Sequence, residues 1–160
     1  PLTRRLHIGF AAPSRAHVDR FWQAGVDAGH RDDGPPGERA YTATYHGAFL
    51  LDPDGNSAEA VHRDGLRTDG AIDHVWMRVR DVAAARDFYL GLAGDADLRL
   101  LRDPPERAGF VRARPGGGTF SVVAGDAPTE GLELGLVSPS GRAATLRDPD
   151  GNLVELVPAG

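Results

Sequence analysis

One ten-residue pattern occurs twice in this chain, as DPDGNSAEAV at residues 52–61 and as DPDGNLVELV at residues 148–157. In both copies the Pro-Asp-Gly-Asn segment predicts a tight turn, and the alternation of apolar and polar residues after it predicts a strand. Each copy places one glutamate at the same point of that strand, Glu59 in the first and Glu155 in the second. We therefore predict that each copy closes a β-hairpin.

A second repeat lies upstream of these turns, as LHIGF at residues 6–10 and DHVWMRV at residues 73–79. Both segments alternate like half-buried strands. Both also carry a histidine near the start, His7 in the first and His74 in the second. The chain therefore repeats a strand that begins with histidine as well as a turn that is followed by glutamate.

The pattern of an amphipathic helix follows each of these two strands. The apolar spacing predicts helices at residues 14–28 and 81–93, and Gly29 and Gly94 are the predicted stop signals. Short strands bounded by Gly and Pro come next, and the first of them is predicted at residues 41–51. The order β-α-β-β-β therefore occurs twice, and it indicates an α+β fold.

Three modules follow from these repeats. The first complete β-α-β-β-β module covers residues 1–66, and the second covers residues 71–126. Residues 131–160 form a shortened third module without a helix, because LELGLVSPS at residues 132–140 lines up with LHIGFAAPS at residues 6–14.

Composition excludes several classes of chemistry. All 18 basic residues are Arg and the chain has no Cys, so a lysine Schiff base, a cysteine nucleophile and a disulfide are all excluded. Any transition-metal site is built from His, Asp and Glu. A net charge of −5 without a basic run argues against nucleic acid as a partner. No apolar run approaches the roughly 20 residues that span a membrane, so we expect a soluble cytoplasmic protein.

Strand alternation assigns the histidines to faces. His7 points to one face of its strand, whereas Ile8 and Phe10 point to the other, toward the first helix. The same parity lets His7, His74 and Glu59 converge on a polar face outside the packed core. Two imidazoles and one carboxylate, with positions left open for substrate, suit Zn, Ni, Fe(II) or Mn. We predict that these three residues bind one divalent metal.

A substrate pocket beside the metal would draw on aromatic and charged side chains. Aromatic rings supply stacking surfaces, and Arg binds anionic groups with two hydrogen bonds. Ordinary core packing and a solvated arginine are the competing interpretations. The predicted pocket residues are Tyr41, Tyr45, His46, Trp76 and Arg78.

At these residues the chain resembles the vicinal oxygen chelate superfamily, which contains glyoxalases, bleomycin-resistance proteins and extradiol dioxygenases. The resemblance covers about residues 6–157. It implies two modules that form a curved mixed sheet around a central pocket, with the helices on the convex side. A divalent metal in that pocket is held by His and Glu. The positions that match the ligands are His7, Glu59, His74 and Glu155.

Two functions are compatible with this resemblance. The first is a metal-dependent lyase or dioxygenase that stabilises an oxyanion of a small oxygenated metabolite, with Glu59 or Glu155 moving the proton. The second is a metal-free protein that sequesters an antibiotic or another planar small molecule. Glu155 is either a fourth ligand or a solvated strand carboxylate.

The third module carries apolar residues but no helix to cover them. A contiguous apolar patch does not remain in water, so either a second copy or the rest of the chain must cover it. We predict a homodimer, with packing of the tail onto the second module as the competing solution. The residues concerned are Leu134, Leu136, Leu146, Val154 and Leu156.

Overall fold

The computed structural model describes residues 2–66, 72–112 and 118–159. These residues form two compact units, and strand β5 crosses from one to the other. We call His7–Val75 the N-terminal unit, and Pro1–Leu6 together with Trp76–Gly160 the C-terminal unit. Among the described residues, no helix is long and apolar enough to cross a membrane.

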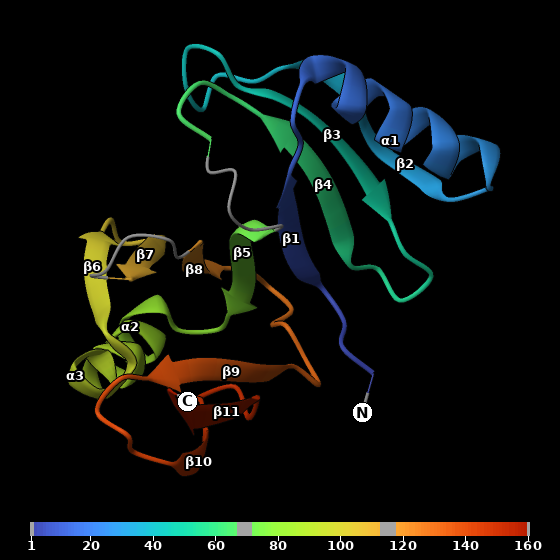
Figure 1. Ribbon diagram of the computed structural model, residues 1–160. Helices are drawn as coiled ribbons and strands as arrows, with labels where there is room; N and C mark the ends of the chain where they lie inside the picture. Colours follow the sequence, from blue (N-terminus) through green and yellow to red (C-terminus); the bar gives the residue numbers. More distant parts are fainter. Residues whose placement is uncertain (1, 67–71, 113–117, 160) are drawn as a thin grey trace. The chain divides into compact units, whose positions relative to one another are not determined.

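The N-terminal unit is a mixed sheet with one helix (Figure 1). Its strand order is β2-β3-β4-β1-β5, in which β4 pairs parallel with β1 and antiparallel with β3. The tight turn at residues 52–56 joins β3 to β4, as predicted. The elements are β1 (Leu6–Ala11), α1 (Arg15–Asp27), β2 (Arg31–Glu38), β3 (His46–Leu51), β4 (Ser57–His62) and the start of β5 (Ile72–Val79).

Helix α1 lies against strands β2 to β4 (Figure 1). Its side chain Val18 is completely buried with Ala48 of β3 and Ala60 of β4. Burying a side chain of this size stabilises the fold by about 1.5–3 kcal/mol. Phe10 lies on the helix-bearing face of the sheet, as predicted, because it pairs with Ala60, which packs with Val18. Phe10 remains 38% exposed, because the helix covers β2 to β4 and leaves β1 at its margin.

Strand β2 is an element that the sequence pattern did not predict. Its sequence, RDDGPPGE, has the composition of a turn. The segment is a strand because its main chain pairs with β3 at the edge of the described sheet, with two shifts of register, and an edge strand tolerates proline and bulges. The predicted strand at residues 41–51 is correspondingly too long, since β3 begins at His46.

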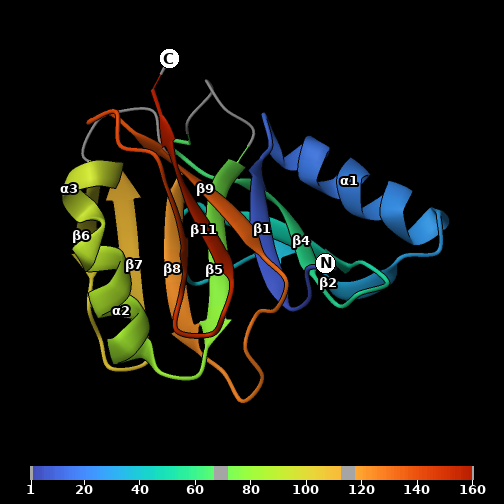
Figure 2. The same ribbon diagram turned by 90° about the horizontal axis from the view of Figure 1, so that it is seen from below.

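The C-terminal unit contains the last residues of β5 and a helical pair packed on its sheet (Figure 2). The strand order there is β5-β8-β7-β6. Asp81 caps α2 by accepting a hydrogen bond from the main-chain N–H of Ala84, as its predicted role requires. Gly94 does not end this helix but lies inside the next one. The elements are α2 (Val82–Gly91), α3 (Ala93–Ala96), β6 (Leu98–Arg102), β7 (Arg107–Arg112) and β8 (Thr119–Ala124).

The tail forms a separate sheet in the order β10-β11-β9, from β9 (Glu133–Ser138), β10 (Ala144–Arg147) and β11 (Leu153–Pro158). Strands β9 and β11 pair parallel, as β1 and β4 do, and the registers correspond: Gly135 pairs with Glu155 as Gly9 pairs with Glu59. The predicted likeness of the tail to the start of the chain therefore extends to the pairing of its strands.

The apolar residues of the tail are buried or half-buried within the C-terminal unit. Val154 and Leu156 are buried, whereas Leu134, Leu136 and Leu146 are half-buried, and β9 contacts α3. Ser140 also donates a hydrogen bond to Asp95 of α3 at 3.0 Å. Packing inside the chain is thus the solution that the structure shows for this patch, while the homodimer remains a prediction. The fold class is α+β with a mixed sheet, as predicted.

Candidate metal centre

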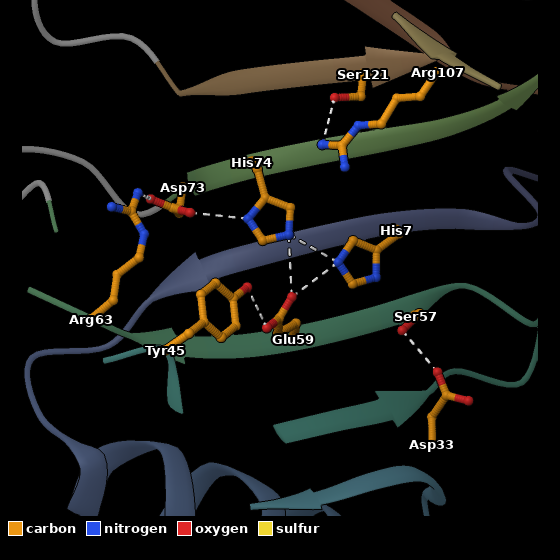
Figure 3. Close-up of polar contacts among 10 residues, drawn as sticks. All are labelled: His7, Asp33, Tyr45, Ser57, Glu59, Arg63, Asp73, His74, Arg107 and Ser121. Atoms are coloured by element: carbon orange, nitrogen blue, oxygen red, sulfur yellow. Dashed lines mark hydrogen bonds and ion pairs between the residues drawn. The ribbon is translucent and has the colours of Figure 1, made fainter. Parts of the chain in front are cut away.

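Three side chains predicted to bind a metal meet in the N-terminal unit (Figure 3). The Nε2 atoms of His7 and His74 lie 3.0 Å apart. Glu59 Oε2 lies 3.1 Å from Nε2 of His7 and 3.2 Å from Nε2 of His74. Strands β1, β4 and β5 each supply one of the three ligand atoms. The sequence prediction that these residues converge is confirmed.

Two glycines provide the space in which these side chains lie. A Cβ atom on Gly9 would stand 2.3 Å from Cε1 of His74, and one on Gly47 would stand 2.6 Å from Oε1 of Glu59. Both distances are shorter than any contact that packed atoms tolerate, so a larger residue at either position would displace a predicted ligand. Neither glycine was predicted to matter for the site.

Asp73, which is itself hydrogen-bonded to Arg63, orients His74. Its Nδ1 donates to Asp73 Oδ2 at 3.0 Å, and Asp73 Oδ1 accepts from Arg63 at 2.8 Å. With Nδ1 committed to Asp73, Nε2 is the nitrogen left to bind a metal once its proton is displaced. Burial opposes ionisation of Asp73, but the contacts with His74 and Arg63 outweigh it and hold the pKa of Asp73 below its ordinary value.

Two of the three candidate ligands are buried, and His7 is half-buried. Glu59 is 1% exposed and His74 5%, so the prediction that His74 lies outside the packed core is wrong. Burial disfavours the charged ring, but hydrogen bonds to Asp73 and Glu59 raise the pKa of His74 above its ordinary value. A metal that binds here must therefore displace a proton from the imidazole.

Glu59 has a further partner in Tyr45. The Tyr45 hydroxyl donates to Glu59 Oε1 at 2.7 Å, while Oε2 faces the two histidines. Burial alone would raise the pKa of Glu59, but the hydrogen bonds from His7, His74 and Tyr45 outweigh it and lower that pKa. Burial and the Glu59 charge raise the pKa of Tyr45 far above its ordinary range, so its hydroxyl remains a donor.

The three ligand atoms fit a divalent transition metal. Atoms separated by 3.0–3.2 Å can all lie about 2.0–2.2 Å from one ion, which is the bond length of imidazole and carboxylate ligands. Imidazole nitrogen also favours Zn, Ni, Fe or Mn over Ca and Mg. Three protein ligands leave coordination positions for substrate or water.

The predicted aromatic pocket residues differ in where they lie. Phe49, which was not predicted to line the pocket, pairs with Glu59 and has its ring centroid 6.0 Å from that of His7. Tyr41 instead sits in the turn before β3, is 57% exposed, and contacts the Tyr45 ring edge to face. His46 points to the other face, where its Nε2 lies 2.9 Å from Asp19 of α1.

The remaining predicted residues belong to the C-terminal unit. The Trp76 ring stacks under the Arg107 guanidinium, whose carbon lies 4.5 Å from the ring centroid. Arg107 also donates a hydrogen bond to Ser121 (Figure 3). Arg78 and Glu155 are exposed on β5 and β11. Pocket roles for Trp76 and Arg78, and a ligand role for Glu155, stay predictions.

Comparison with solved structures identifies the architecture. Glyoxalase I from Zea mays superposes with a TM-score of 0.64 at 19% sequence identity, over 95% of this chain and 66% of that chain. A variant of the same enzyme gives a TM-score of 0.67. The fold is that of glyoxalase I. A protein from Bacillus subtilis assigned as a dioxygenase also superposes on this chain, with a TM-score of 0.61 at 12% identity, over 95% of this chain and 61% of that chain.

These likenesses show that the chain has the kind of fold that the predicted resemblance implied. The chain spans slightly less than two thirds of the length of the maize glyoxalase I chains. No protein-family model and no curated protein matches the sequence. The shared glyoxalase I fold by itself does not carry the activity, which must be argued from the site.

Proposed function

We propose that this chain is a metal-dependent enzyme of the glyoxalase or dioxygenase kind, acting on a small oxygenated metabolite. The observation that supports it most is the triangle of His7, Glu59 and His74, with candidate ligand atoms 3.0–3.2 Å apart and the last two residues buried. A divalent ion bound there supplies a Lewis acid that stabilises negative charge on two neighbouring substrate oxygens.

The residues of the chain have distinct parts in this proposal. His7 and His74 would each supply one ring nitrogen to the metal, and Asp73 keeps the His74 ring in one orientation. Glu59 or Glu155 would take and return the proton of the substrate. Phe49 provides an apolar surface beside His7. We further propose a cytoplasmic homodimer with a small-molecule substrate and no nucleic-acid partner.

Metal titration tests the proposal. We expect purified wild-type protein to bind one equivalent of Zn, Ni, Mn or Fe(II) in titration calorimetry, and Glu59→Gln to lose most of that affinity while keeping its shape. His17→Ala is the matched control, because His17 is exposed on α1 and bonds only Ser14 among the contacts described. A wild-type protein that takes up none of these metals overturns the proposal and favours the metal-free sequestering protein.

A further inference from the structure

The two oxygens of Glu59 have different partners. Oε2 lies within 3.2 Å of both histidine Nε2 atoms, whereas Oε1 accepts the hydrogen bond from the Tyr45 hydroxyl at 2.7 Å. Glu59 therefore presents Oε2 to the two candidate metal-binding histidines and Oε1 to Tyr45 (Figure 3).

We propose that Tyr45 is a positioning residue that restricts Glu59 to a single metal-binding oxygen, and this inference rests on the proposed function. A carboxylate that binds through both oxygens occupies two coordination positions, whereas one that binds through a single oxygen occupies one. By holding Oε1, Tyr45 keeps one more position open for an exogenous oxygen ligand.

The surroundings of Tyr45 suit this role. Tyr45 is 6% exposed, and its main-chain carbonyl accepts a 2.9 Å hydrogen bond from the main-chain N–H of Arg39. Gly47 of β3, two residues after Tyr45, leaves room for the contact between the phenol and Oε1 of Glu59. A Cβ atom at position 47 would stand 3.1 Å from Cε1 of Tyr45.

The decisive comparison is Tyr45→Phe against Tyr89→Phe. Both substitutions remove a buried phenolic oxygen that donates to a carboxylate, Glu59 Oε1 for Tyr45 and Asp148 Oδ2 for Tyr89 of the C-terminal unit. Each protein is loaded with Co(II) and titrated with acetohydroxamate, a small chelator with two vicinal oxygens. We expect Tyr45→Phe to bind acetohydroxamate at least about tenfold more weakly than wild type, the lower range for loss of an outer partner of a metal ligand, and Tyr89→Phe to match wild type.

X-ray absorption at the cobalt edge gives a second readout. We expect one additional carboxylate oxygen at the metal in Tyr45→Phe and none in Tyr89→Phe. Equal acetohydroxamate affinity and an unchanged cobalt environment in Tyr45→Phe overturn the inference. They leave the proposed function standing, because the wild-type protein still binds metal in that case.

A measurement on the wild-type protein decides the matter if Tyr45→Phe does not fold. The metal-induced infrared difference spectrum, with Glu59→Gln as its reference, reports the carboxylate of Glu59. A wide separation between its two stretching bands, typical of one-oxygen binding, supports the inference, and a narrow separation overturns it. A wild-type protein that binds no metal overturns the proposed function, and the inference falls with it.

Discussion

Asp73 and His74 are consecutive residues of β5, yet their side chains are hydrogen-bonded to each other, Oδ2 to Nδ1, at 3.0 Å. Consecutive side chains of a regular strand point to opposite faces, so both must lean along the strand to meet. The contact lets one short segment supply a predicted metal ligand together with the carboxylate that orients it.

Asp73→Asn is expected to weaken metal binding about 10- to 100-fold. The amide cannot carry the negative charge that pairs with the imidazole and with Arg63, so His74 loses both orientation and basicity. Titration calorimetry with Zn or Mn measures the change. Asp64→Asn is the control, since Asp64 is exposed in the turn after β4. Equal affinities in the two variants would show that Asp73 does not tune the centre.

Gly9→Ala is expected to remove stoichiometric metal binding. The new methyl group would stand 2.3 Å from the His74 ring, and the ring must move away from Glu59 to make room. Gly135→Ala is the matched variant, because Gly135 has the same register position opposite Glu155 and its Cβ would meet Val157 at an ordinary 4.0 Å. Should Gly9→Ala bind metal as wild type does, the described placement of His74 is incorrect.

Asp52→Asn is expected to lower stability at neutral pH but not in acid. Burial would raise the pKa of Asp52, but hydrogen bonds from Asn56, Asp54 and Gly55 outweigh it and lower that pKa below its ordinary value of 3.8. The stabilisation is therefore fully present above pH 3.8 and is lost as the pH falls through the lower folded-state pKa.

The measurement is urea unfolding of the wild type and of Asp52→Asn across this pH range. We expect a difference of about 1 kcal/mol at pH 7, the contribution of one hydrogen bond, that shrinks toward zero in acid. Asp54→Asn removes the same charge from the same turn and serves as the control. A difference that is constant with pH would contradict the assigned role of the carboxylate.

The homodimer is tested by sedimentation equilibrium. The tail is covered within its own unit, so the prediction now depends on the free edge of β2, which pairs only with β3 among the described residues. We expect about twice the 17.0 kDa chain mass at micromolar concentration. A mass of one chain throughout that range excludes the homodimer.

The sequence predicts those features of this protein that depend on contacts between residues close together in the chain. Asp52 and Asp148 each accept hydrogen bonds from the main chain two and four residues later, so the two turns form from contacts within five residues. The period of a strand then places Glu59, His7 and His74 on definite faces. Turn geometry and alternation are properties of short segments, and the sequence by itself determined them.

Tertiary structure decided whatever depends on partners distant in the chain. The segment RDDGPPGE becomes strand β2 only because β3 offers it an edge, and no local preference of that segment favours a strand. Tyr45, the residue before β3, donates a hydrogen bond to Glu59 of the adjacent strand β4. Position 9 requires glycine because the ring of His74, 65 residues later in the chain, occupies the space of a side chain there. Such contacts are set by packing between segments, so the face of each ligand was predictable while the partners that hold it were not.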